Sequence, residues 1–178
     1  MTLAYIVTEG QFDQEILEKL LPKPLLQETA IIAAGGKYAA QSLASTILPI
    51  KQLPVALVID GDTQDEHRIR EQADLLNQLL YQSSPGIPFR VFIAVPALEV
   101  IFLEYPSVIE KIAERSFSDI ELQLAKSNPR QFLSNILGEP PTFIHKILTN
   151  LTEENLHNLQ QHPLIKGLMS FLPETAPI

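Results

Sequence analysis

The chain has 178 residues, no cysteine and a formal net charge of −8, from 13 lysines and arginines against 21 aspartates and glutamates. This length suffices for one domain with its own core, and the lack of cysteine excludes disulfides and thiolate chemistry. No apolar run approaches the roughly 20 residues of a membrane span, and no secretion signal is visible. We therefore expect a soluble, cytoplasmic protein without a basic stripe for tight, unaided binding to nucleic acid.

The first hundred residues alternate between strand and helix patterns. Apolar, β-branched runs predict strands at residues 3–8, 29–34, 54–59 and 89–95. Helical periodicity predicts helices over residues 11–21, 38–48 and 63–82, and a short helical turn from Pro96. Strands that alternate with helices of this length form parallel sheets with right-handed crossovers and with helices on both faces. The fold class is therefore α/β, a Rossmann-like sheet of about four parallel strands.

The remainder of the chain has no strand signal. Prolines divide it into short helical segments at residues 107–117, 117–128, 129–137, 141–151, 152–162 and 163–172. We predict an α/β core over residues 1–104 and a helical C-terminal extension, residues 105–178, that packs on this core.

A polar group follows each predicted strand. Glu9 comes after the first strand, Gly35-Gly36-Lys37 after the second, Asp60 and Asp62 after the third, and Glu99 after the fourth. The carboxyl ends of parallel strands lie along one edge of the sheet, where open α/β folds bind ligands. We therefore expect these residues to converge on one edge.

Converging carboxylates repel one another. Two unit charges about 4 Å apart cost roughly 4 kcal/mol at an effective dielectric near 20, against a total domain stability of roughly 5–15 kcal/mol. Either some of the acids are protonated or a hard cation sits among them, and ligand sets made only of oxygen suit Mg²⁺ or Mn²⁺. The four histidines do not have metal-ligand spacing.

Each of these features also has a simpler structural interpretation. Glu9, Asp13 and Glu99 could be acids favoured by the N-terminal end of a helix dipole. Thr63 and Glu66 match a capping box for the long helix, with Asp62 as another candidate cap. The two glycines could have no role other than to allow a tight turn between strand and helix. The stretch "AGGK" (34–37) also lacks the spacing of a P-loop. Asp60, which ends a buried strand, is the hardest of these acids to explain by solvation.

Two motifs together resemble the Toprim domain of topoisomerases, bacterial primases, small RNA-maturing nucleases and OLD (overcoming lysogenization defect) nucleases. These are "IVTEGQFD" (6–13) and, about fifty residues later, "VIDGD" (58–62). "IIAAGGKYAA" (31–40) and "VPALEVIFL" (95–103) look most like the OLD type. The resemblance covers roughly residues 3–104. The chain departs from the family at "DTQDEH" (62–67), where a glycine often follows the Asp-x-Asp motif.

The resemblance implies a site for Mg²⁺-dependent or Mn²⁺-dependent phosphodiester cleavage. The implied metal ligands are the acids Glu9, Asp13, Asp60, Asp62 and Glu99. Glu9 would also act as a general acid or base, Lys37 would neutralise charge on the phosphate, and Gly35, Gly36 and Lys37 would bind substrate. An ATPase domain usually precedes an OLD-type Toprim module. We therefore expect a nuclease that binds nucleic acid weakly by itself and works with a separate ATPase.

Three other functions are compatible with parts of the sequence. A catalytically silent binding or regulatory module would hold Mg²⁺ or a Mg-nucleotide at the acidic edge and dock a partner. A plain interaction domain would leave this edge solvated. A haloacid dehalogenase-like phosphotransferase is suggested by "DGDT" (60–63), but that motif wants Thr or Val where Gln64 stands, and it wants an early strand.

Overall fold

Four parallel strands form the centre of the molecule in the computed structural model, which describes residues 1–173. The strands are β1 (Ala4–Thr8), β2 (Thr29–Ala33), β3 (Val55–Asp60) and β4 (Phe89–Ala94), in the spatial order β2-β1-β3-β4. All neighbouring pairs are parallel. The predicted α/β class, with its parallel sheet and flanking helices, is confirmed.

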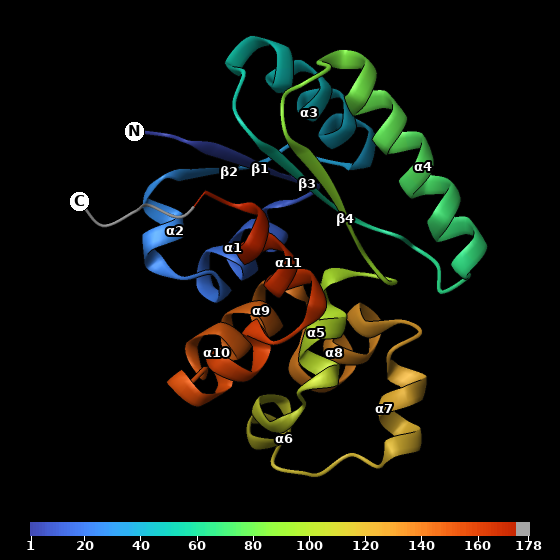
Figure 1. Cartoon of the computed structure of the whole chain (residues 1–178). Coiled ribbons are helices and arrows are strands. Elements are labelled where there is room, and N and C mark those ends of the chain that lie inside the picture. Colours follow the sequence, from blue (N-terminus) through green and yellow to red (C-terminus); the bar gives the residue numbers. More distant parts are fainter. Residues whose placement is uncertain (174–178) are drawn as a thin grey trace.

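Helices cover both faces of the sheet (Figure 1). One face carries α3 (Lys37–Lys51) and α4 (Glu66–Ser83), and the other carries α1 (Gln11–Leu20) together with helices of the C-terminal section. Between α1 and β2 lies α2 (Lys23–Gln27), which the sequence analysis did not predict. After β4 come the short 3₁₀ helix η1 (Leu98–Val100) and α5 (Ile101–Glu104).

The C-terminal section consists of short helices, as predicted. They are α6 (Ser107–Ala113), α7 (Asp119–Ala125), α8 (Pro129–Leu137), α9 (Pro140–Thr149), α10 (Glu153–Gln160) and α11 (Pro163–Phe171). Helix α9 contacts α1, and α11 contacts β4. Every helix within residues 1–173 is too short or too polar to span a lipid bilayer.

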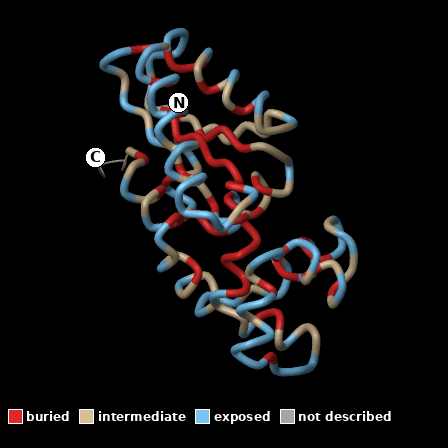
Figure 2. The backbone as a smooth tube through the Cα atoms, turned by 90° about the vertical axis from the view of Figure 1, so that its right-hand side faces the viewer, coloured by how far each residue is buried: buried red, intermediate tan, exposed pale blue. Residues whose placement is uncertain are grey.

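Alternate residues of the strands supply two cores, one on each side of the sheet. Ile6 of β1 and Val58 of β3 pack in a large cluster with Phe143 and other residues of the C-terminal helices. Leu57 belongs to the opposite cluster, which α3 and α4 cover. All residues of β3 are buried, and the buried backbone in Figure 2 runs through the sheet. Because one core joins the sheet to the C-terminal helices, the boundary at residue 104 stays a prediction.

The start of α4 differs from the predicted capping box. The helix begins at Glu66, and its cap is Asp65, whose Oδ1 accepts hydrogen bonds from the backbone N–H groups of His67 and Arg68. Thr63 Oγ1 accepts from the backbone N–H of Asp65 instead. The connection between β3 and α4 therefore runs to Asp65, and Asp62 does not cap the helix.

We expect Phe143→Ala to lower the free energy of unfolding by about 3–5 kcal/mol, because this fully buried ring joins α9 to the core that lies against the sheet. Leu75→Ala, at a position 67% exposed, serves as the control and should change stability by less than about 0.5 kcal/mol. Urea unfolding followed by circular dichroism measures both values. Two separate unfolding transitions in the wild-type protein would contradict a shared core.

Candidate active site

The order of the strands creates a crevice at the carboxyl ends of β1 and β3. The chain leaves β1 for β2 through α1 on one face of the sheet, and it leaves β3 for β4 through α4 on the other face. Crossovers that diverge in this way open a crevice between the two adjacent strands, which is the usual ligand site of open α/β sheets. Glu9 and Asp60 lie at this point.

Glu9 connects the ends of three strands. Its Oε2 accepts a hydrogen bond of 2.6 Å from the backbone N–H of Asp60. Its carbonyl oxygen accepts hydrogen bonds from the backbone N–H groups of Gly35 and Gly36, each 2.8 Å long. Because Glu9 bonds to the end of β3 and to the loop after β2, it does more than interact with the dipole of the helix that follows it. The two glycine N–H groups are engaged within the protein, while their backbone at φ +93° and +146° gives the loop its shape.

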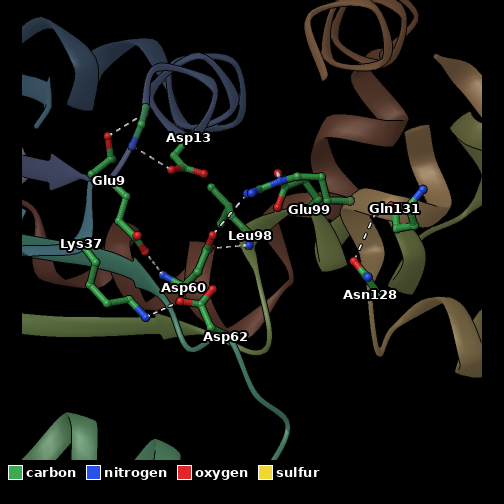
Figure 3. Close-up of polar contacts among 12 residues, drawn as sticks. Glu9, Asp13, Lys37, Asp60, Asp62, Leu98, Glu99, Asn128 and Gln131 are labelled. Atoms are coloured by element: carbon green, nitrogen blue, oxygen red, sulfur yellow. Dashed lines mark hydrogen bonds and ion pairs between the residues drawn. The ribbon is translucent and has the colours of Figure 1, made fainter. Parts of the chain in front are cut away.

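Asp13 and Asp60 are the buried acids of the crevice. Asp13 lies in the first turn of α1, where its Oδ2 accepts a hydrogen bond of 3.1 Å from the backbone N–H of Gly10. Asp60 ends β3, and its Oδ1 accepts a hydrogen bond of 3.0 Å from the backbone N–H of Leu98. Both residues are less than a tenth exposed. Figure 3 shows Glu9, Asp13 and Asp60 near one another, although they come from different elements.

Gly61 separates Asp60 from Asp62 in a closely packed turn. The backbone N–H of Gly61 donates to Ala94 O, and that of Asp62 donates to Pro96 O. A Cβ atom on Gly61 would lie 2.3 Å from Ile69 Cδ1. A larger residue would therefore force the side chain of Ile69 to move.

Asp62 points to the more exposed side of the site. Its Oδ2 lies 2.6 Å from Lys37 Nζ, and its side chain is 68% exposed. The burial and charge effects that raise the pKa values of Asp13 and Asp60 involve Glu9 and Glu99 but not Asp62. Asp62 and Lys37 thus form a pair beside the buried acids.

Glu99 comes from η1 and is almost completely buried. Its Oε1 accepts a hydrogen bond of 3.0 Å from Arg130 Nε. Its Oε2 is buried without a hydrogen-bond partner among the described residues. A buried carboxylate oxygen with no partner is costly, and it marks a place where a cation or a water molecule would be stabilised.

Arg130, at the start of α8, is the site residue that the sequence analysis missed. Besides Glu99, its guanidinium reaches Asp60, with 3.4 Å between Arg130 Nη2 and Asp60 Oδ2. Burial opposes its charge, but Glu99, Asp60 and Asp13 together raise the pKa of Arg130 above its usual range. The repulsion expected among the acids was a signal that some cation had to be present, although it did not indicate which one.

Crowding changes the proton affinity of the two buried aspartates. Burial, followed by the charges of Asp13, Glu99 and Glu9, raises the pKa of Asp60 from 3.8 to about 8. Burial, followed by the charge of Glu99, raises the pKa of Asp13 to about 6. Arg130 offsets this only in part, because its side chain is half exposed. Both answers to the predicted repulsion, protonation and a counter-charge, are therefore visible.

The acids fit a hard divalent cation by donor chemistry, although they are not arranged as a finished metal site. All of them offer oxygen, and Glu99 has an unused buried oxygen. Among residues 1–173, no three acidic or histidine side chains surround a common point where they could hold an ion. Binding would therefore require Asp60 and Glu99 to exchange Arg130 for the cation. The assignment of Glu9, Asp13, Asp60, Asp62 and Glu99 as metal ligands stays a prediction.

Two cavities meet at the acids. One, of about 540 Å³, is lined by residues that include Glu9, Asp13, Gly36, Asp60 and Arg130. The other, of about 290 Å³, shares Asp60, Asp62 and Arg130 and extends to the segment 127–129 before α8. A ligand that contacts Asp60 and Arg130 can thus continue in two directions.

The fold is thus a parallel α/β sheet, flanked by helices, with acids at the carboxyl ends of β1 and β3. No protein-family model and no curated protein matches the sequence. Among solved structures, the chain is similar to the C-terminal region of the Burkholderia pseudomallei OLD protein, with a TM-score of 0.52 and 14% identity over 95% of this chain and 99% of that one.

A second similar structure is the C-terminal region of the Xanthomonas campestris pv. campestris OLD protein. The TM-score is 0.48 and the identity 14%, over 96% of this chain and 97% of that one. At this level of identity the Burkholderia similarity establishes the fold, which is that of an OLD-type Toprim module, as the sequence predicted. The similarity includes the C-terminal helices, since it spans nearly the whole chain.

In EDTA, we expect the free energy of unfolding to fall as the pH rises from about 6 through about 8. The folded protein holds a proton on Asp60, whose pKa is about 8, while the unfolded chain with a pKa of 3.8 has released it, so rising pH removes this stabilisation. Asp60→Asn should flatten this dependence and be more stable than wild type at pH 8. Urea unfolding at several pH values measures the slope.

His162 supplies an internal check on this measurement. Burial lowers its pKa, so the unfolded chain binds this proton more readily and His162 makes the protein less stable as the pH falls below about 6.5. This contribution has the opposite sign and is common to both proteins, so the difference between wild type and Asp60→Asn isolates Asp60. Equal slopes in the two proteins would refute the raised pKa.

Proposed function

We propose that the protein is a nuclease-type phosphodiesterase that acts on nucleic acid and depends on Mg²⁺ or Mn²⁺. The observation that carries the proposal is the convergence of Glu9, Asp13, Asp60 and Glu99, from three separate segments of the chain, at one end of the sheet. Repulsion within such a group of acids lowers the stability of the fold. Features that lower stability in this way are expected at functional sites. The OLD-type Toprim fold and the sequence resemblance both favour this assignment.

In this proposal Asp60 and Asp62 would hold one cation, with Glu9 as a further ligand or as the general acid or base. Asp13 and Glu99 would complete or support a second ion. Bound ions of this kind activate water and stabilise the leaving oxygen of a phosphodiester. Glu9, fixed by the backbone N–H of Asp60, is placed to hold or release a proton there. The backbone of Gly35 and Gly36 forms a wall of the larger cavity, where the substrate would lie.

Lys37 and Arg130 supply positive charge for the phosphate. In the free protein each is paired with acids, Lys37 with Asp62 and Arg130 with Asp60 and Glu99. If a cation were held by those acids, both side chains would be available to the phosphate oxygens and would stabilise the negative charge that develops there. Arg130 is suited to this role because a guanidinium can bind two phosphate oxygens at once.

A binding or regulatory module is the second candidate function. It is favoured by one observation: Asp60, Asp62 and Glu99 are paired with protein cations, and no three acids of residues 1–173 gather around a common point. Such a module would hold a cation or a Mg-nucleotide without cleaving a phosphodiester. In either case the net charge of −8 disfavours tight, unaided contact with polyphosphates, and we propose that a separately encoded ATPase assists.

The first test is cleavage of single-stranded and double-stranded DNA and RNA with Mg²⁺, Mn²⁺ or EDTA. We expect metal-dependent cleavage that Asp60→Ala and Glu9→Ala each reduce by at least about a hundredfold. Asp74→Ala, on the exposed surface of α4, is the matched control and should cleave like wild type. Cleavage that persists in EDTA, or in the two site variants, would refute the catalytic assignment. A Tm raised by Mg²⁺ through Asp60, without any cleavage, would establish the binding module.

The second test concerns Arg130. We expect Arg130→Gln to lower the free energy of unfolding in EDTA by about 1–3 kcal/mol, since Asp60 and Glu99 lose their counter-charge. Mg²⁺ should then raise the Tm of this variant more than that of wild type, because the ion no longer competes with a guanidinium. Arg70→Gln, at an exposed pair on α4, is the control. An equal Mg²⁺ effect in all three proteins would mean that the cation does not bind where Arg130 lies.

A further inference from the structure

Binding of nucleic acid by this protein needs a source of affinity besides charge. The chain carries −8 overall, and the cations at its site, Lys37 and Arg130, are both paired with acids. Non-specific binding of nucleic acid usually comes from cations that displace counterions from phosphates. Here that contribution is small, so contacts to the bases have to supply more of the affinity.

Tyr38 offers such a contact. It is the second residue of α3, and 86% of it is exposed. The aromatic pairs and arginine–aromatic contacts of the described residues all involve phenylalanines elsewhere in the fold. The ring of Tyr38 therefore presents its faces to solvent.

In the chain, Tyr38 comes directly after residues of the candidate active site. Gly35 and Gly36 line the larger cavity, Lys37 contacts Asp62, and Tyr38 follows directly. With about 3.8 Å between successive Cα atoms, Tyr38 lies within roughly 8 Å of the cavity wall. This upper limit corresponds to about two nucleotides along a strand, whose repeat is roughly 3.4 Å.

The loop before Tyr38 is held firmly, so the ring projects from a fixed base. The N–H groups of Gly35 and Gly36 donate to Glu9 O, and the ion pair of Lys37 with Asp62 anchors the first residue of the helix. An exposed aromatic residue on a fixed support loses little conformational entropy when a flat ligand stacks on it. Single exposed apolar residues are common on proteins, but this one adjoins the groups that would bind the phosphate.

We propose that Tyr38 is a stacking platform for an unpaired base next to the phosphate at the site, and that the substrate is therefore single-stranded nucleic acid. The inference rests on the proposed action on nucleic acid and adds to it the form of the substrate. Aromatic side chains bind bases of any sequence in this way, because every base has a π-face. In a duplex the bases are stacked on one another and cannot take this position.

The experiment measures binding by fluorescence anisotropy in a Ca²⁺ buffer at low salt, so that binding is read without a cleavage step. The probes are a short labelled single-stranded DNA and the blunt duplex of the same sequence. We expect Tyr38→Ala to weaken binding of the single strand about tenfold, which corresponds to about 1.4 kcal/mol, and to leave duplex binding unchanged. Tyr38→Phe should bind like wild type, because the ring is retained.

Tyr81→Ala is the matched control. Tyr81 is the other exposed tyrosine at 62%, and it lies 15 positions after the start of α4, about 22 Å along that helix. This variant should bind the single strand like wild type. We also expect Tyr38→Ala to fold normally, because the exposed ring makes little packing contact and alanine is the best helix former.

A set of strands with one abasic position each completes the test. Removing the stacked base should weaken binding of wild type about tenfold and cause no further loss in Tyr38→Ala, as expected for two groups that contact each other. Wild type that does not bind the single strand, Tyr38→Ala that binds like wild type, or Tyr38→Phe that binds like Tyr38→Ala would each overturn the proposal.

This outcome can be separated from that of the proposed function. If no phosphodiester is cleaved under any condition but the abasic strands couple to Tyr38, the nuclease assignment fails and the nucleic-acid ligand stands. If cleavage depends on Asp60 but binding is indifferent to Tyr38, the nuclease assignment stands and the stacking platform fails.

Discussion

The repulsion between Glu9, Asp13, Asp60 and Glu99 is the constraint on which the rest of the site depends. Burial strengthens this repulsion, since it removes the water that would screen it. The protein responds through a raised pKa of Asp60, backbone N–H donors to three of the acids, and the guanidinium of Arg130. Each of these responses can be reversed, so the acids could still bind a divalent cation in place of the proton or the guanidinium.

Much of the fold and part of the site could be predicted from the sequence, because both depend on local patterns. The apolar runs of the strands differ in period from the helical segments, so the two types of element could be told apart. Their regular alternation along the chain then predicted a parallel sheet. Glu9 and Asp60 were predicted because a charged residue directly after a buried strand can only lie at the end of the sheet. Their closeness then followed from the rule that parallel strands end at one edge.

The missing parts depend on contacts between distant segments. Arg130 comes 70 positions after Asp60, in an amphipathic segment where an arginine resembles any exposed cation. The start of α4 was predicted at Thr63 because the capping box matched, yet the backbone N–H of Asp62 is bonded to Pro96 O and the side chain of Asp65 makes the cap contacts. Helix α2 was missed because Pro22 and Pro24 resemble a loop, although a proline is compatible with the first turn of a helix.

The late position of Arg130 in the chain has a consequence for biosynthesis. When a nascent polypeptide has emerged as far as residue 104, every acid of the crevice is present, but Arg130 and the helices that bury one face of the sheet are still to come. During that interval the half-made protein has unbalanced charge at one end of its sheet and uncovered apolar surface beside it. Arrival of α8 supplies the guanidinium, but the apolar surface is covered in full only when α9, α10 and α11 have also emerged.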